Sequence, residues 1–156
     1  SNTKLASGVA PVYEYLKRGI PVAIGTDGPA SNNCLDFFRE MFLATGLQKL
    51  SHGAEAVDAM DVLTMACKNG AYACGFADCD CLAPGKQADL ILIDLQQPNM
   101  QPLNNIEKNV VYSGSKQNVI LTMIAGKVLY ERGEFMIGDD PARIYAEANR
   151  IIRGMK

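Results

Sequence analysis

Histidine is almost missing from this sequence of 156 residues: His52 is the only one, and no His-x-His pair occurs. A metal site that depends on several imidazole ligands therefore cannot be completed by these residues alone. His52 lies in the polar stretch Ser51-His52-Gly53-Ala54, between two expected helices, where a lone histidine is usually a surface residue. We assign it no role as a ligand.

The sequence also lacks an excess of charge and any long hydrophobic run. Its net charge is −2 and its pI is near 5.4, with lysines and arginines scattered, which argues against binding to nucleic acid or to an anionic membrane surface. Its apolar stretches are interrupted within about ten residues, well below a membrane span, and no basic-then-apolar signal pattern opens the chain. We therefore expect no nucleic-acid partner, no membrane partner and a cytoplasmic location.

Cysteine is present, but in an odd number, and nothing marks secretion, so we expect thiols and not disulfides. Cys79-Asp80-Cys81 looks like half of a thiolate metal site. A closed zinc site needs about four ligands, however, and no second pair stands at a matching spacing. Small apolar side chains in a connection explain these two cysteines better. The five cysteines are Cys34, Cys67, Cys74, Cys79 and Cys81.

The most informative segment that is present is a short apolar run ending in an acid, Pro21-Val22-Ala23-Ile24-Gly25-Thr26-Asp27-Gly28. Its β-branched residues and its lack of charge before Asp27 predict a strand at about 21–27, covered on both faces as in a parallel sheet. Asp27 then projects from the end of a buried strand. A carboxylate there can begin a metal site, or it can cap the next helix or bond a turn.

Helices are expected on both sides of this strand. Apolar residues at helical spacing predict one helix over 9–18 and a second from about 35 to 50. Asp58 is the expected cap of a third helix, which Gly75 ends.

After residue 81 the pattern changes to that of strands. A compact strand is predicted over 90–95, and a hairpin closed at Gly126 over 119–130. Asp140 and Pro141 then begin a last helix.

A single buried strand flanked by helices is not a sheet, so the first part of the chain predicts the last piece of a (β/α)8 TIM barrel. A full barrel takes about 250 residues, and we expect this piece to be cut from a longer protein. The predicted fold is α/β: a C-terminal fragment of a TIM barrel, an appended small β-sandwich unit and a terminal helix. The expected division is 1–80 for the barrel part, 81–138 for the β unit and 139–156 for the helix.

Several motifs together resemble the C-terminal part of the amidohydrolase superfamily. They are Gly25-Thr26-Asp27-Gly28 followed by Ser31-Asn32-Asn33, the opening Ser1-Asn2-Thr3-Lys4-Leu5-Ala6-Ser7-Gly8, the entry Pro84-Gly85-Lys86-Gln87-Ala88-Asp89-Leu90, and the hairpin at Gly126-Lys127-Val128. Within the superfamily the sequence most resembles the 5′-methylthioadenosine/S-adenosylhomocysteine deaminases and related chlorohydrolase-like enzymes.

The resemblance implies a metal-dependent barrel in which 21–27 is the eighth strand and Asp27 is both a metal ligand and the catalytic acceptor of a proton from water. The divalent metal would be zinc, with iron as the alternative. The other ligands, a His-x-His pair and a later histidine, and a proton-shuttling glutamate would precede Ser1. We therefore expect the isolated fragment to be inactive and without metal.

The function implied by the resemblance is hydrolytic deamination of an aminopurine nucleoside by metal-activated water. A small-molecule amine is thus the expected substrate. A chlorohydrolase, or a guanine or cytosine deaminase of the same superfamily, is an alternative, because the same chemistry serves several leaving groups. A second class of alternative is a non-catalytic assembly module in which Asp27 only caps.

Three further residues are candidates for binding the substrate, because loops that follow barrel strands face the active site. Ser31 and Asn32 follow the predicted strand, although helix capping explains them equally well. Lys4 belongs to the preceding loop, where a solvated lysine is the more common case. We also expect a homo-oligomer, since a strand at 21–27 without neighbours offers an unpaired edge.

Overall fold

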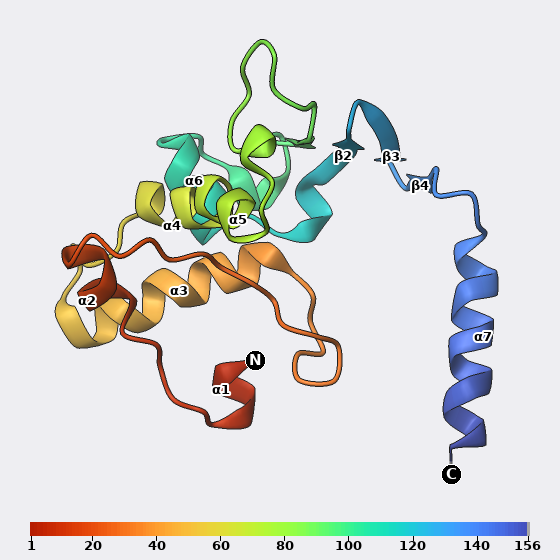
Figure 1. Ribbon diagram of the computed structural model, residues 1–156, viewed down its shortest axis with the longest axis horizontal. Coiled ribbons are helices and arrows are strands. Elements are labelled where there is room, and N and C mark those ends of the chain that lie inside the picture. The colour runs from red at the N-terminus through yellow and green to blue at the C-terminus, as the bar shows by residue number, and fades with distance from the viewer. Residues whose placement is uncertain (156) are drawn as a thin grey trace. The chain divides into compact units, whose positions relative to one another are not determined.

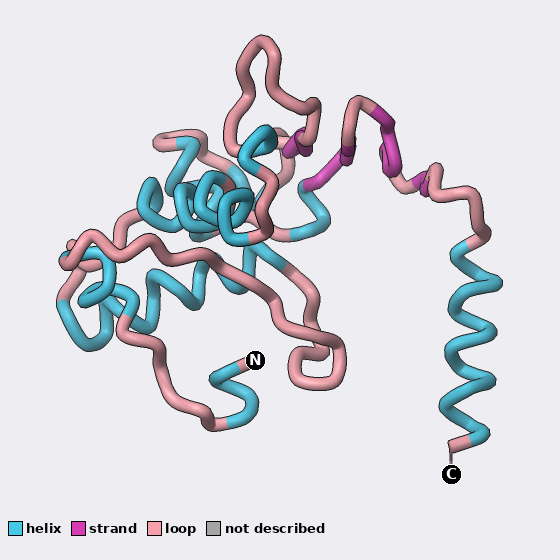
Figure 2. The backbone as a smooth tube through the Cα atoms, viewed as in Figure 1, coloured by secondary structure: helices cyan, strands magenta, loops and turns pink. Residues whose placement is uncertain are grey.

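The computed structural model describes residues 1–155, which form two compact units. The first consists of Ser1–Lys86 with Asp94–Asn118 and is helical. The second consists of Gln87–Ile93 and the residues from Val119 onward, and it holds a small sheet and the last helix (Figure 1, Figure 2). The chain thus returns to the first unit after its first strand, and the expected division of the parent protein at residues 80 and 138 stays a prediction.

The first unit is built around helix α3, Phe37–His52. Asp36 caps this helix by accepting a hydrogen bond from the Phe38 N–H at 3.1 Å, so the cap is neither Ser31 nor Asn32, which the sequence also allowed. Helices α4 and α6 pack on α3. The remaining elements of this unit are α1 (Asn2–Leu5), α2 (Val12–Lys17), α4 (Ala59–Ala66), α5 (Lys68–Ala73), α6 (Ile106–Tyr112) and the 3-10 turns η1 (Ala77–Cys79), η2 (Pro98–Met100) and η3 (Lys116–Asn118).

Two buried polar side chains tie neighbouring segments to α3. The Thr45 hydroxyl donates to the Val57 carbonyl at 2.6 Å. The Gln48 side chain accepts from the Tyr13 N–H at 3.1 Å and donates to the Ala10 carbonyl at 2.9 Å. These bonds satisfy groups that would otherwise cost roughly 1–3 kcal/mol each when buried. The apolar core around them consists of Val12, Phe38, Met41, Ala56, Val57, Ala59, Val62, Met65, Met100, Val110 and Val111.

Helix α6 lies in a stretch that was expected to belong to the β unit, and in the structure it packs on α3 and α4 within the first unit. Asn105 caps the helix by accepting from the Lys108 N–H at 2.8 Å, and Val110 is buried. Gly114 follows at a close approach to α3. A Cβ at Gly114 would lie 2.7 Å from the Phe38 ring and closer still to the Val110 carbonyl, so glycine is required at this position.

The strand predicted over 21–27 is not formed: within residues 1–155 no strand pairs with this segment. The segment is nevertheless extended and alternates in exposure, with Val22, Ile24 and Thr26 half-buried and the residues between them exposed. The Ile24 N–H donates to the Met65 carbonyl at 3.4 Å, and the Asn69 amide donates to the Val22 carbonyl at 2.8 Å. One face therefore contacts the α4–α5 region, and the other face is bare instead of covered as expected. A β-strand needs a neighbouring strand with which to form backbone hydrogen bonds, and the described residues supply none for this segment.

The second unit contains one antiparallel sheet of four strands in the order β1-β2-β3-β4. The hairpin predicted at Gly126 is confirmed, with Ala125 at φ 50 and Gly126 at φ 75, the left-handed pair that suits a two-residue turn. The predicted sandwich needs a second sheet, and none occurs within residues 1–155. The strands are β1 (Leu90–Ile93), β2 (Val119–Ile124), β3 (Lys127–Glu131) and β4 (Glu134–Phe135).

The predicted last helix is confirmed as α7, Pro141–Gly154. Asp140 caps it by accepting from the Ala142 N–H at 3.0 Å, and Pro141 occupies its first turn, where a missing N–H is tolerated. None of the helices in residues 1–155 has both the length and the apolar character needed to cross a bilayer.

Candidate functional site

Asp27 lies where the extended segment turns into the loop that leads to α3. Its φ of 62 places it in the left-handed region, which aspartate and asparagine tolerate better than most residues. Its Oδ1 accepts a hydrogen bond from the Gly28 N–H at 2.7 Å. The side chain is exposed, so the loop holds this carboxylate in place while leaving it accessible.

Hydrogen bonds stabilise the charged form of Asp27. The Ser31 hydroxyl has the largest effect, followed by the Gly28 N–H and the Ser1 hydroxyl, and together they lower the pKa of Asp27 below its ordinary value of 3.8. The Ser31 Oγ also lies 3.3 Å from the Gly28 carbonyl, and its single proton can serve one of these acceptors at a time. Asp27 is therefore ionised at neutral pH and offers its oxygens to a cation or a proton.

Asn32 is buried directly behind this loop, with 6% of its surface exposed. Its amide nitrogen donates to the Thr26 carbonyl and to Oε1 of Glu40, both at 2.8 Å, and its Oδ1 accepts from the Cys34 N–H at 3.1 Å. Both amide protons are thus used within the fold, and a role for Asn32 in binding substrate stays a prediction. Sequence reasoning missed Glu40, because an acid in the first turn of a helix is already explained by the helix dipole.

The structure brings Lys4 to the same loop. Its Nζ donates to Oδ1 of Asn33 at 2.5 Å, and both side chains are exposed. Ser1, in the same opening segment, helps to lower the pKa of Asp27. The opening segment and the loop after Asp27 therefore lie together, as expected for two loops at one end of a barrel.

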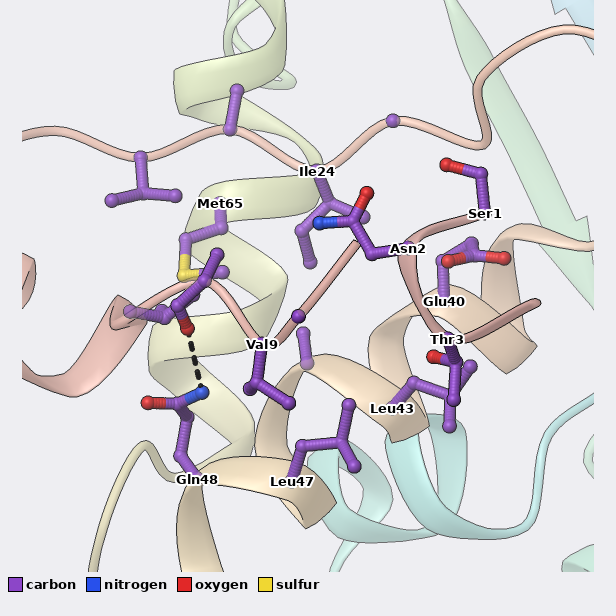
Figure 3. Close-up of a pocket in the computed structure, with 17 residues that line it drawn as sticks. Ser1, Asn2, Thr3, Val9, Ile24, Glu40, Leu43, Leu47, Gln48 and Met65 are labelled. Atoms are coloured by element: carbon purple, nitrogen blue, oxygen red, sulfur yellow. Dashed lines mark hydrogen bonds between the residues drawn. The ribbon is translucent and has the colours of Figure 1, made fainter. Parts of the chain in front are cut away.

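A pocket of about 230 Å³ lies beside the extended segment, between α3 and the opening residues. Ile24, Val9 and Leu43 line its apolar part, and Glu40 and Ser1 lie at its polar side (Figure 3). Asp27, Ser31 and Asn32 do not line it. The pocket is therefore adjacent to the predicted site and separate from it.

The donor set of the described residues does not make a complete metal site. Within residues 1–155 no group of three His, Cys, Asp or Glu side chains is placed to hold a metal ion. His52 is the last residue of α3 and stacks on Tyr13, with ring centroids 4.6 Å apart. Its ring therefore packs at the end of the helix and is not part of the Asp27 loop. No disulfide joins the cysteines of these residues. Asp27 fits one position of a metal site, and the other ligands would have to come from outside this chain.

The sequence is similar to proteins of a known family. Residues 1–129 match the amidohydrolase family. The 5-methylthioadenosine/S-adenosylhomocysteine deaminase of Dictyoglomus thermophilum is 40% identical over 157 residues, which cover 100% of this chain and 37% of that protein.

Solved structures agree with this match. The structure of an adenosine deaminase from Xanthomonas campestris with bound zinc has a TM-score of 0.90 and 39% identity, covering 96% of this chain and 34% of that one. Atrazine chlorohydrolase from Arthrobacter aurescens TC1, complexed with zinc, has a TM-score of 0.86 and 27% identity, covering 97% and 34%. The chain thus spans about a third of the length of the relatives it matches.

Proposed function

The chain belongs to the amidohydrolase family, and from that premise we propose that it is the C-terminal third of a metal-dependent hydrolase that deaminates an aminopurine nucleoside. The substrate would be of the 5′-methylthioadenosine or S-adenosylhomocysteine type. Identity of 40% along the whole chain to a deaminase of that name supports this substrate over a triazine, for which identity is 27%. The whole protein would be a (β/α)8 barrel, with residues 21–27 as its last strand.

The observation that carries the proposal is the state of Asp27. It is an exposed carboxylate at the end of an extended segment, it is held by the Gly28 N–H, and its pKa is lowered. A carboxylate that stays ionised at neutral pH can bind a divalent cation and can accept a proton from a nucleophilic water. Asp27 would do both in the complete enzyme.

The metal would be zinc, with iron as the alternative, since two structures similar to this chain contain zinc. When bound, such a metal lowers the pKa of water to roughly 7, which makes a nucleophile at neutral pH. Water would add to the ring carbon that bears the amine, and the amine would leave as ammonia. The remaining ligands would come from the part of the enzyme outside this chain.

Ser31 and Lys4 would contribute to the mouth of the site. The Ser31 hydroxyl already interacts with the Asp27 carboxylate, and Lys4 reaches the same loop through Asn33. A substrate that approaches Asp27 would therefore pass close to both side chains.

The test uses the full-length protein that carries this chain, with 5′-methylthioadenosine and S-adenosylhomocysteine as substrates and ammonia as the measured product. We expect Asp27→Ala to lower kcat/KM at least about a hundredfold and to lower zinc content, since even supporting groups of metal sites contribute about 10–100-fold.

The matched control is Asp78→Ala, which removes an exposed aspartate of η1, away from the Asp27 loop. Its activity should equal that of the wild type. Unchanged turnover in Asp27→Ala would refute the assignment of this residue, and chloride release from a chlorotriazine without ammonia release would refute the substrate class.

A further inference from the structure

Asn32 differs from the other polar side chains near Asp27, because it is buried and its amide N–H groups and its carbonyl oxygen all form hydrogen bonds. We propose that Asn32 is a positioning residue, which fixes the Asp27 loop to helix α3 through Glu40 and so sets where the Asp27 carboxylate points. This inference rests on the proposed function, since it assigns Asn32 a role in the same metal-dependent reaction.

The first step of the argument is the path of the contacts. Thr26 immediately precedes Asp27, and its carbonyl accepts from the Asn32 amide at 2.8 Å. The same amide donates to Oε1 of Glu40, also at 2.8 Å, one turn into α3. Asn32 thus connects the backbone next to Asp27 to a rigid helix through a single side chain.

The second step is the conformation that this connection maintains. Asp27 has a positive φ, which costs roughly 1–3 kcal/mol for a non-glycine residue and persists only where the surroundings hold it. The Asn32 amide fixes the carbonyl on one side of Asp27, and the bond from the Gly28 N–H fixes the other side. Without Asn32 the Thr26 carbonyl would lose a buried partner, and the peptide before Asp27 could rotate.

The third step is the charge of the partner. Glu40 is half-buried and lines the polar side of the neighbouring pocket (Figure 3). A hydrogen bond to a charged carboxylate is stronger than one between neutral groups. Substitution of Asn32 by aspartate would replace this bond by the repulsion of two carboxylates. An amide is therefore the side chain that satisfies both Thr26 and Glu40.

The experiment uses the full-length protein and measures zinc affinity by competition with a chelator, together with kcat, KM and thermal stability. We expect Asn32→Ala to weaken zinc binding about tenfold, as for other groups that orient a metal ligand, and to lower kcat with little change in KM. Glu40→Ala should have the same effect, whereas Glu40→Gln keeps an acceptor, although a neutral one, and should restore most of the zinc affinity and kcat. The control Asn149→Ala, an exposed asparagine of α7, should match the wild type.

A double variant separates coupling through Glu40 from independent effects. Because both residues act in one connection, Asn32→Ala and Glu40→Ala together should weaken zinc binding no more than either alone. Additive losses would overturn the proposal. If Asn32→Ala does not fold, the comparison of Glu40→Ala with Glu40→Gln decides the question by the same measurements.

The remaining outcomes are also informative. Wild-type zinc affinity and kcat in Asn32→Ala, with a lower melting temperature, would show a purely structural role and overturn the proposal. A raised KM with unchanged zinc affinity would show a substrate contact and overturn it as well. A wild-type protein that neither binds zinc nor releases ammonia would refute the proposed function itself, and a loss seen in Asp27→Ala alone would refute only this inference.

Discussion

At the scale of single residues, two aspartates show how differently this fold uses one side chain. Asp27 is exposed, and its carboxylate is bonded by neighbouring hydroxyl and N–H groups. Asp80 instead pairs with Lys86 at 2.7 Å, with 11% of its side chain exposed, and accepts from the Tyr72 hydroxyl at 3.3 Å. Lys86 also donates to the Ala77 carbonyl at 2.9 Å, so this pair fastens the turn that leads to β1. The Asp27 carboxylate is thus exposed to solvent, whereas the Asp80 carboxylate is already bonded to Lys86 and Tyr72.

The Asp80–Lys86 pair predicts a pH dependence of stability. The hydrogen bond from Lys86 is the main cause that lowers the pKa of Asp80 below 3.8, and Asp80 in turn raises the pKa of Lys86 above 10.5. A carboxyl group with a lowered pKa in the folded state contributes its full stabilisation above its unfolded pKa and loses it as the pH falls through the folded pKa. The pair should therefore weaken below about pH 4, and at the alkaline end as the pH rises through the raised pKa of Lys86.

Thermal unfolding between about pH 2 and pH 7 measures this effect. Asp80→Asn should flatten the acidic fall in melting temperature relative to the wild type. Glu55→Gln, at an exposed acid outside this turn, provides the control and should retain the wild-type slope. Equal slopes for the wild type and Asp80→Asn would contradict the assignment.

At the scale of elements, helix α4 begins with a reciprocal pair of hydrogen bonds. The Asp61 N–H donates to the Asp58 side chain at 2.9 Å, and the Asp58 N–H donates to the Asp61 side chain at 3.1 Å. This capping box satisfies two N–H groups that the helix itself leaves unpaired. Val62 and Met65 of the same helix lie in the core.

We expect Asp58→Ala to destabilise the protein by about 1 kcal/mol, because the cap is lost while the buried face of α4 is unchanged. Asp58→Asn keeps an acceptor for the Asp61 N–H and should remain close to the wild type. Urea unfolding at neutral pH compares the two variants. Equal loss in both would show that the charge, and not the cap, is what stabilises the helix start.

The elements that sequence reasoning found are those whose signals are local. Asp58 and Asp140 are caps, Gly126 closes a hairpin, and each marks its element without reference to distant residues. Helix α6 was missed because Val110 and Val111 follow a polar stretch in which few apolar residues mark a helical face. The strand at 21–27 failed for the opposite reason, since its own residues have the right pattern but the described chain supplies no partner.

In the candidate site, too, local sequence signals were readable and contacts between distant residues were not. Asp27 and Lys4 were predicted as site residues from motif order, and their roles stay predictions, although the structure brings Lys4 to the loop that follows Asp27. The hydrogen bond between Asn32 and Glu40 was not predicted, because Glu40 is eight residues away and only the folded chain brings the two together. A short polar motif thus predicts where a site lies better than it predicts which of its side chains face the solvent.

At the scale of the whole molecule, the bare face of residues 21–27 is the feature that the proposed parent enzyme would change. If this segment is a barrel strand there, its backbone N–H groups would gain partners from neighbouring strands. The homo-oligomer, the cytoplasmic location and the inactivity of the isolated chain stay predictions.

Hydrogen exchange tests this feature directly. We expect the amides of 22–26 to exchange at least about tenfold more slowly in the full-length protein than in the isolated chain, because paired amides exchange only after opening. The buried middle of α3 provides the internal reference, since its hydrogen bonds are already complete. Equal rates for 22–26 in the two proteins would argue against their pairing as a strand.

The order in which the chain leaves the ribosome has a consequence for the first unit. Its core contains Phe38 and Met41 from early in the sequence, but α6, which packs on α3 and α4, ends at Tyr112 after the chain has already passed through β1. A nascent chain that pauses before α6 emerges would keep part of this apolar surface open to chaperones and to other unfinished chains. Translation must therefore pass β1 of the second unit before α6 can complete the core of the first unit.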